Sequence, residues 1–136
     1  MYLLDTDILS NLMKRSPPGV LVSRVTQIPP EQQFTSSITL GELIYGAYRL
    51  REHTATLMQK IEDTLLPNLP VLPFDAAAAR RYGELRAELE RLGTPIGDAD
   101  MRIAAIALTH GLKVVTGNER HFRRVPGLRM ENWLKQ

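Results

Sequence analysis

The chain has 136 residues, with 17 Lys and Arg against 15 Asp and Glu, a formal net charge of +2 and 43% hydrophobic residues. This length and composition are typical of a soluble globular protein, and we expect residues 1–136 to form a single domain. The absence of Cys excludes disulfides and thiolate metal sites, and it suits a cytoplasmic protein. Because no apolar run is long enough for a membrane span and no signal peptide is evident, we expect neither membrane attachment nor export.

The charges are distributed unevenly along the chain. Residues 1–110 carry 11 basic and 13 acidic side chains, whereas residues 111–136 carry 6 basic and 2 acidic side chains. A cluster of cations favours a polyanionic partner, because neutralising phosphates releases counterions. A solvated basic face has the same composition, so charge alone leaves nucleic-acid binding open.

The first half of the chain alternates short apolar runs with helical patterns. An apolar run at residues 2–4 is followed by a weak helix over residues 7–14 and by a second short helical segment. Pro29 and Pro30 precede a β-prone run at residues 34–38. The apolar positions between residues 40 and 50 then have the spacing of an amphipathic helix. The predicted order is therefore strand, helices, strand, helix.

The second half repeats this alternation. A stripe over residues 57–65 predicts a helix, and the apolar run at residues 71–72 precedes Asp75, a predicted N-cap. Residues 78–92 form the clearest amphipathic pattern, which Gly93 ends. Residues 101–108 are apolar almost all round, which indicates a buried helix, and residues 113–116 indicate a buried parallel strand. The whole pattern predicts an α/β fold with a central, mostly parallel sheet.

Acidic and hydroxyl side chains follow the predicted strands or open the buried helix. They are Asp5, Thr6 and Asp7, Thr39 to Glu42, Asp98 and Asp100, and Thr116, Asn118 and Glu119. Ligands of parallel sheets bind at the carboxyl ends of the strands. Carboxylates gathered there repel one another unless a divalent cation neutralises them, and oxygen ligands select Mg²⁺ or Mn²⁺. Such a site suits phosphodiester hydrolysis.

Most of these acids also have a structural explanation. Asp7 can cap a helix, Thr39 and Glu42 fit a capping box, and Asp98 or Asp100 can stabilise a helix N-terminus. Asp5 is harder to explain in this way, because an acid directly after a strand should be partly buried and burial of an unpaired carboxylate is costly.

Four segments of the sequence together resemble one known family. MYLLDTDILS, SSITLGELIYG, GTPIGDADMRIAAIAL and LKVVTGNERHFRRVPGLRMENW, in this order and spacing, are similar to PIN-domain ribonucleases, particularly VapC-like toxins of toxin–antitoxin pairs. The resemblance covers essentially the whole chain. It implies a three-layer α/β/α domain, an endoribonuclease that depends on Mg²⁺ or Mn²⁺, a homodimer, an RNA substrate and a cognate antitoxin.

The resemblance also implies roles for particular residues. It places three catalytic, metal-binding acids on Asp5, Glu42 and Asp100, and hydroxyl groups near the site on Thr6 and Thr116. The family's fourth position is often Asp and here falls on Asn118, which weakens the case for a second tightly held metal.

The remaining polar residues of these segments are assigned supporting roles. We expect Asp98 to cap the buried helix, and Glu119 either to support the site or to point to solvent. His121 is interpreted as a substrate contact or a surface side chain, because it lies between arginines. Three basic residues that follow the last strand are expected to bind RNA beside the acids: Arg120, Arg123 and Arg124.

Two alternatives remain at this stage. Asp5 and Asp7 resemble the D-x-D opening of haloacid-dehalogenase-like phosphohydrolases. Those enzymes also need a lysine and a later pair of acids, but here the paired acids, Asp98 and Asp100, come before Lys113, the only suitable lysine. A non-catalytic module that binds RNA or protein on a PIN-like scaffold is the other alternative, and the presence of all three acids argues against it.

Overall fold

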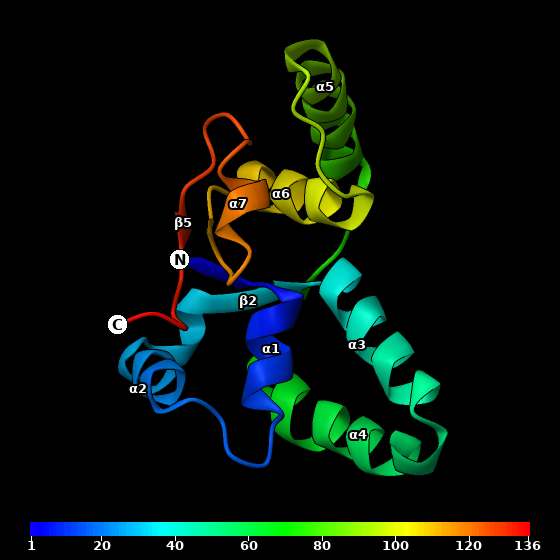
Figure 1. Cartoon of the computed structure of the whole chain (residues 1–136), viewed down its shortest axis with the longest axis vertical. Helices are drawn as coiled ribbons and strands as arrows, with labels where there is room; N and C mark the ends of the chain where they lie inside the picture. The colour runs from blue at the N-terminus through cyan, green and yellow to red at the C-terminus, as the bar shows by residue number, and fades with distance from the viewer.

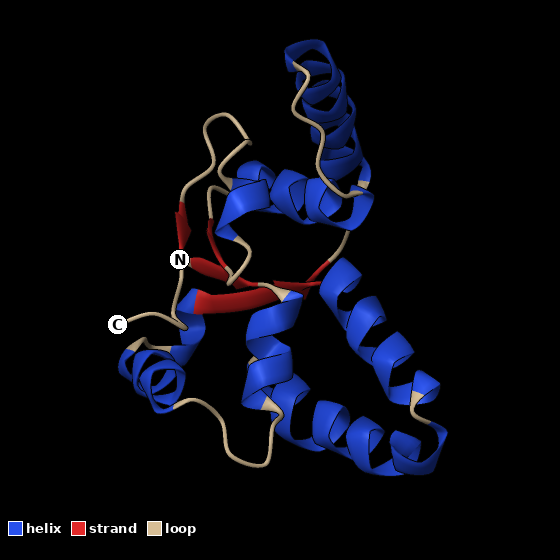
Figure 2. Cartoon of the chain, in the orientation of Figure 1, coloured by secondary structure: helices blue, strands red, loops and turns tan.

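The computed structural model describes residues 1–136 and contains one five-stranded sheet flanked by helices on both faces (Figures 1 and 2). The strands are β1 (Tyr2–Leu4), β2 (Gln33–Ser36), β3 (Val71–Leu72), β4 (Lys113–Val115) and β5 (Met130–Glu131). They lie in the order β3-β2-β1-β4-β5, and every neighbouring pair is parallel. The predicted three-layer α/β/α architecture is confirmed, and the sheet is wholly rather than mostly parallel. The sequence did not predict β5.

The helices divide into two layers (Figure 1). One layer lies below the sheet and consists of α1 (Thr6–Leu12), α2 (Gly19–Gln27), α3 (Ser37–Arg49) and α4 (Thr54–Lys60). The other lies above it and consists of α5 (Ala76–Leu92), α6 (Asp98–His110) and α7 (Glu119–Phe122). Short helical turns connect them at η1 (Pro30–Gln32), η2 (Arg51–His53), η3 (Ile61–Leu65) and η4 (Leu66–Asn68). No helix is long and apolar enough to cross a membrane.

Alternation along the central strands produces two hydrophobic cores. Leu3 of β1 and Val114 of β4 point into the core beneath α5 and α6, whereas Leu4 and Val115 point into the core shared with α1 and α3. Successive side chains of a strand face opposite sides of the sheet, so each strand contributes to both cores. This explains why the central strands read as continuous apolar runs.

The ends of the longer helices follow the predicted chemistry in part. The Asp75 carboxylate accepts a hydrogen bond from the Ala78 amide at the start of α5, and Gly93 ends that helix with a φ of 69° that favours glycine. Three other capping predictions are wrong: Asp7 lies within α1, whose N-cap is Asp5, and the N-cap of α6 is Gly97 rather than Asp98. Nor do Thr39 and Glu42 form a capping box.

The cap of α3 comes one turn earlier than that capping box requires. Ser36 is the N-cap, and its hydroxyl accepts a hydrogen bond from the Thr39 amide. Thr39 therefore occupies the third helical position, and the Glu42 carboxylate is free of the cap and turned toward other partners.

The strand order creates a crevice between β1 and β4. From β1 the chain moves outward through β2 to β3, and it then returns on the other side of β1 to form β4 and β5. The loops after β1 and β4 therefore diverge, and ligands of parallel sheets bind at this topological switch point. The residues directly after these two strands are Asp5 and Thr116.

Candidate active site

Asp5 is a buried carboxylate at the carboxyl end of β1. Its side chain is only 5% exposed, because the sheet continues past it through a 2.9 Å hydrogen bond from the Asp5 amide to the Val115 carbonyl. Its pKa is raised from 3.8 to about 7, chiefly because burial disfavours the charged form; Asp7 and Asp100 contribute to the increase, and two hydrogen bonds oppose it. Those bonds come from the Thr6 amide at 2.7 Å and the Thr116 hydroxyl at 2.8 Å. Hydrogen bonds therefore hold Asp5 in place, but no cationic side chain pairs with its carboxylate.

Asp100 approaches this site from α6. Its Oδ2 atom lies 3.0 Å from His121 Nδ1 and 3.3 Å from Asn118 Nδ2. Asn118 is in turn anchored, because its backbone amide donates a 2.9 Å hydrogen bond to the Thr116 hydroxyl, which also contacts Asp5. One chain of contacts therefore joins the end of β1, the end of β4 and the start of α6.

Glu42 reaches the same crevice from α3. The Thr6 hydroxyl donates to Glu42 Oε1 at 2.5 Å, and it lies 3.2 Å from the Thr39 hydroxyl. Because the Thr6 amide contacts Asp5, one residue links two of the predicted acids. Thr6 thus joins Asp5 to Glu42, and Asp100 lies near enough to Asp5 to raise its pKa, but no three His, Cys, Asp or Glu side chains close around a single point.

Asp7, which the sequence places among the acids after the first strand and which can also cap a helix, contacts the segment after β4. Its Oδ2 atom accepts a 2.8 Å hydrogen bond from the Gly117 amide, and desolvation raises its pKa. A Cβ atom at position 117 would lie 2.5 Å from that oxygen, so any other residue there would displace the Asp7 carboxylate. The other oxygen, Oδ1, is buried without a hydrogen-bond partner. The sequence offered two signals for Asp7, its place after the first strand and its spacing two residues after Asp5.

Asp98 faces a different neighbourhood from Asp100. Its carboxylate accepts hydrogen bonds from the Tyr82 hydroxyl and, at 2.7 Å, from Arg102 Nε, and both contacts hold its pKa below the ordinary value. The Arg102 guanidinium also lies over the rings of Phe74 and Tyr82. Asp98 is therefore an exposed ion-pair partner on the surface of α5 and α6.

The basic residues expected to bind RNA lie on and after α7, the short helix that follows Asn118. Arg123 pairs loosely with Glu119 at 3.8 Å, and Arg124 donates to the Pro95 carbonyl at 2.8 Å. Glu119 itself bonds to Lys135 and Asn132, which lower its pKa, so it faces the C-terminal segment. Glu119 does not contact the three acids through any hydrogen bond or ion pair.

The residues at the crevice fit a divalent cation with oxygen ligands. Asp5 and Asp7 are desolvated, and the charge of Asp100 raises the pKa of both. One oxygen of Asp7 has no hydrogen-bond donor. Ionised carboxylates in such a place are costly unless a cation offsets their charge.

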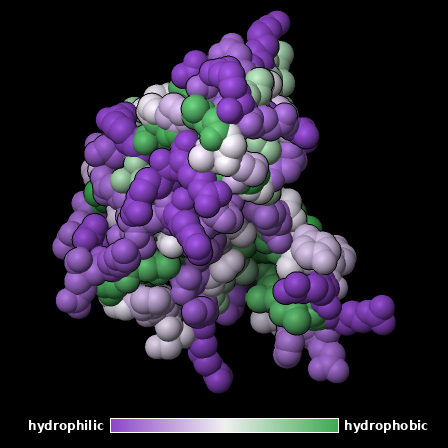
Figure 3. Space-filling view, turned by 45° about the horizontal axis from the view of Figure 1, so that its top comes forward, coloured by the Kyte–Doolittle hydropathy of each residue, from purple (hydrophilic) through white to green (hydrophobic).

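An apolar cleft adjoins the acidic crevice. It has a volume of about 320 Å³, lies between α1, α3 and α4, and includes Glu42 in its lining together with Leu43, Leu50 and Leu57. Leu50 is 50% exposed. In Figure 3, hydrophobic surface gathers at the lower right of the molecule, where α3 and α4 lie in Figure 1. The acid site thus continues into a surface suited to an apolar partner.

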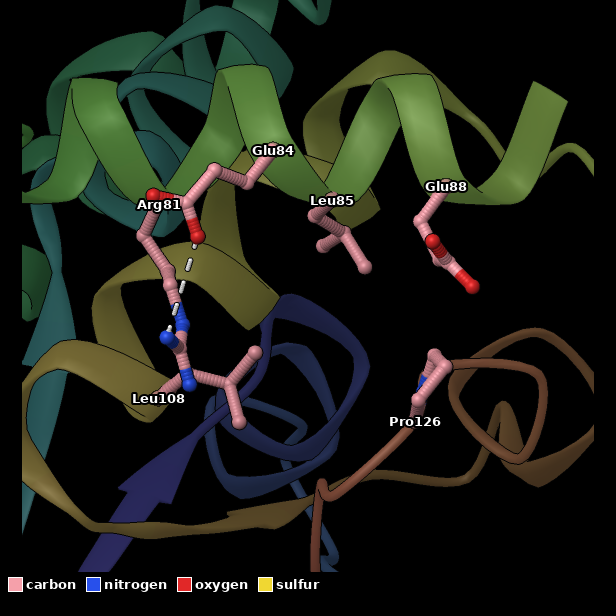
Figure 4. A pocket seen from close by; sticks show the side chains of 6 residues that line it. All are labelled: Arg81, Glu84, Leu85, Glu88, Leu108 and Pro126. Carbon is pink, nitrogen blue, oxygen red and sulfur yellow. Dashed lines mark ion pairs between the residues drawn. The ribbon is translucent and has the colours of Figure 1, made fainter. Parts of the chain in front are cut away.

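A second cleft, of about 240 Å³, lies away from the acids in the layer formed by α5 and α6 (Figure 4). Its α5 wall carries an ion pair between Arg81 and Glu84 at 4.0 Å, and Glu88 is paired with Arg91. None of the predicted site residues lines it. We assign it no part in the site.

Comparisons with known proteins agree on one family. The sequence model of the family described as PIN domain matches residues 2–128. The chain is 39% identical to the tRNA(fMet)-specific endonuclease VapC of Shigella flexneri, over 97% of both chains. It is similar to a structure of DNA-bound VapBC from Salmonella typhimurium, with 40% identity, a TM-score of 0.86 and 97% of both chains covered. A toxin-antitoxin complex from Klebsiella pneumoniae is also similar, with 26% identity, a TM-score of 0.72 and 98% of both chains covered. The chain belongs to the PIN-domain family.

Proposed function

We propose that the protein is an endoribonuclease that depends on Mg²⁺ or Mn²⁺ and that Asp5, Glu42 and Asp100 hold the metal. The observation that carries this proposal is the buried Asp5 carboxylate at the β1/β4 switch point, with Asp100 brought close enough to raise its pKa. Its relative of 39% identity is named an endonuclease specific for a tRNA, which supports RNA as the substrate.

The residues of the chain divide the work. The Thr6 amide and the Thr116 hydroxyl hold the two Asp5 oxygens, and the Thr6 hydroxyl holds Glu42. Preorganised ligands of this kind lower the cost of binding a cation. The chemistry that a divalent cation supplies when bound is polarisation of the phosphoryl group and activation of water.

The arginines on and after α7 serve the approach of the substrate. RNA must come close to carboxylates that repel it, and basic side chains beside the crevice offset that repulsion. We assign this role to three residues: Arg120, Arg123 and Arg124. Arg123 pairs with Glu119 and Arg124 donates to a carbonyl, but both contacts lie at the surface, so both side chains remain able to contact phosphate.

We also propose that this nuclease is the toxin of a toxin–antitoxin pair and acts as a homodimer. The relative from Klebsiella pneumoniae is a toxin-antitoxin complex. Here the cleft between α1, α3 and α4 can accept an apolar helix of an antitoxin. Because Glu42 lines that cleft, a basic side chain from the same partner can reach the acids and compete with the metal.

The test is cleavage of RNA by the purified protein. We expect cleavage with Mg²⁺ or Mn²⁺ and none with EDTA. Attack of water on phosphorus leaves 5′-phosphate and 3′-hydroxyl ends, whereas attack by the ribose 2′-hydroxyl leaves a 2′,3′-cyclic phosphate. Cyclic ends or undiminished cleavage in EDTA would refute the mechanism. Expression should also slow growth, and co-expression with the adjacent reading frame should restore it.

A further inference from the structure

His121 was interpreted from the sequence as a substrate contact or surface residue, but it lies against Asp100. Its Nδ1 atom is 3.0 Å from Asp100 Oδ2 and 3.0 Å from the Asn118 side-chain amide, and that amide is 3.3 Å from the same Asp100 oxygen. The three side chains therefore present three polar atoms in a triangle with sides of 3.0 to 3.3 Å.

We infer that Asp100, Asn118 and His121 form a mixed nitrogen and oxygen face for a divalent transition metal, which gives this nuclease a preference for such metals over Mg²⁺. This inference rests on the proposed metal-dependent function and adds His121 as a ligand. It changes the predicted ligand set, which consisted of oxygen alone.

The size of the triangle matches a coordination shell. Neighbouring ligands at right angles around an octahedral cation with bonds of about 2.1 Å are about 3.0 Å apart. The three separations here are within a few tenths of an ångström of that value. Three donors that are each adjacent to the other two occupy one face of an octahedron and leave the opposite positions to water, substrate or other acids.

The hydrogen bonds within this triangle depend on which nitrogen of His121 carries the proton. If the Asn118 amide donates to His121 Nδ1, that nitrogen carries no proton, and its lone pair faces the Asp100 carboxylate at 3.0 Å. If Nδ1 instead carries the proton, it donates to Asp100 Oδ2, and the Asn118 side-chain amide donates to the same oxygen. A cation can replace these bonds once the Asn118 amide turns by 180°, because it then meets a carboxylate oxygen, an imidazole nitrogen and an amide oxygen.

The anchoring of the face also favours coordination. The backbone amide of Asn118 is fixed by the Thr116 hydroxyl, which also holds Asp5. Asp100 is on α6 and His121 on α7, so rigid elements carry two of the ligands. The imidazole of His121 is 40% exposed, which leaves room for a metal to enter.

The nitrogen donor determines the metal preference. Mg²⁺ binds oxygen and gives up water reluctantly, whereas imidazole is a good ligand for first-row transition metals. A site in which one of three ligands is imidazole should therefore gain more affinity for Mn²⁺ than for Mg²⁺. Replacing His121 by glutamine retains an amide oxygen and removes the nitrogen donor.

The test measures metal binding directly, with Mn²⁺ and Mg²⁺ as probes and without RNA. Titration calorimetry of the full chain gives both dissociation constants, and pulsed electron paramagnetic resonance of the Mn²⁺ complex detects coupling to a bound ¹⁴N nucleus. His110→Gln is the matched control, because His110 ends the helix that Asp100 opens, roughly 15 Å away along its axis. Circular dichroism checks that each variant is folded, and His121→Glu is a second variant should His121→Gln fail to fold.

We expect ¹⁴N coupling in the natural protein and in His110→Gln, and no such coupling in His121→Gln or His121→Glu. The preference for Mn²⁺ over Mg²⁺ should fall at least tenfold in His121→Gln and stay unchanged in the control. Absence of ¹⁴N coupling in the natural protein, its persistence without His121, or an unchanged preference would overturn the inference. Cleavage of RNA that EDTA stops, without ¹⁴N coupling, would leave the proposed function intact, whereas ¹⁴N coupling without any cleavage would refute only that function.

Discussion

Replacing Asp5 by asparagine should stabilise the metal-free protein at neutral and alkaline pH, even though it removes a residue of the proposed active site. Asp5 is 5% exposed, and its pKa is raised from 3.8 to about 7, chiefly by burial. Asparagine has the same shape and fits the same partners, because its oxygen can accept from the Thr6 amide and its NH₂ group can donate to the Thr116 hydroxyl.

The size of the effect follows from linkage between protonation and folding. Between pH 4 and pH 7 the folded state binds a proton that the unfolded state has lost, so stability falls as pH rises through this window. Each unit of pKa difference corresponds to about 1.4 kcal/mol, which gives about 4 kcal/mol over the whole window. Between pH 5 and pH 8, the advantage of Asp5→Asn over the natural protein should grow by roughly 3 kcal/mol.

The assay is urea unfolding in EDTA at pH 5 and pH 8, followed by circular dichroism. The matched control is Asp98→Asn, since Asp98 is exposed and its partners lower its pKa, so no stabilisation at pH 8 is expected. Added Mg²⁺ or Mn²⁺ should stabilise the natural protein and have little effect on Asp5→Asn. A stability difference that is equal at pH 5 and pH 8, or an Asp5→Asn variant that is the less stable one at pH 8, would refute the reasoning.

Three further predictions follow from the geometry of the site. Asp100→Asn should abolish most RNA cleavage because it removes a ligand charge, whereas Asp98→Asn should retain cleavage, and the reverse result in a cleavage assay would exchange their roles. Gly117→Ala should weaken both folding and metal binding, because its Cβ would lie 2.5 Å from an Asp7 oxygen, and a melting temperature equal to that of the natural protein would contradict this. Neutralising three arginines should make the logarithm of the RNA association constant less dependent on salt, by up to about one unit of slope per lost phosphate contact; an unchanged slope would exclude the role proposed for them: Arg120, Arg123 and Arg124.

Sequence patterns alone were enough to predict the α/β layers and to place acidic residues directly after the strands. The apolar run at residues 2–4 and the two valines within residues 113–116 indicated strands buried on both faces, and parallel strands bring the residues after them to the same edge. Local rules therefore placed Asp5 and Thr116 correctly side by side.

The contacts of individual polar side chains became evident only in the folded chain. Asp7 looked like a helix cap, but the return of the chain after β4 brings the Gly117 amide to it across 110 positions of sequence. His121 looked like a surface residue among arginines, but α7 turns it toward Asp100 on α6. Periodicity and capping rules describe interactions within a few residues, whereas these contacts join segments far apart in the chain. The packing of α6 and α7 on the sheet sets the positions of the side chains that meet there.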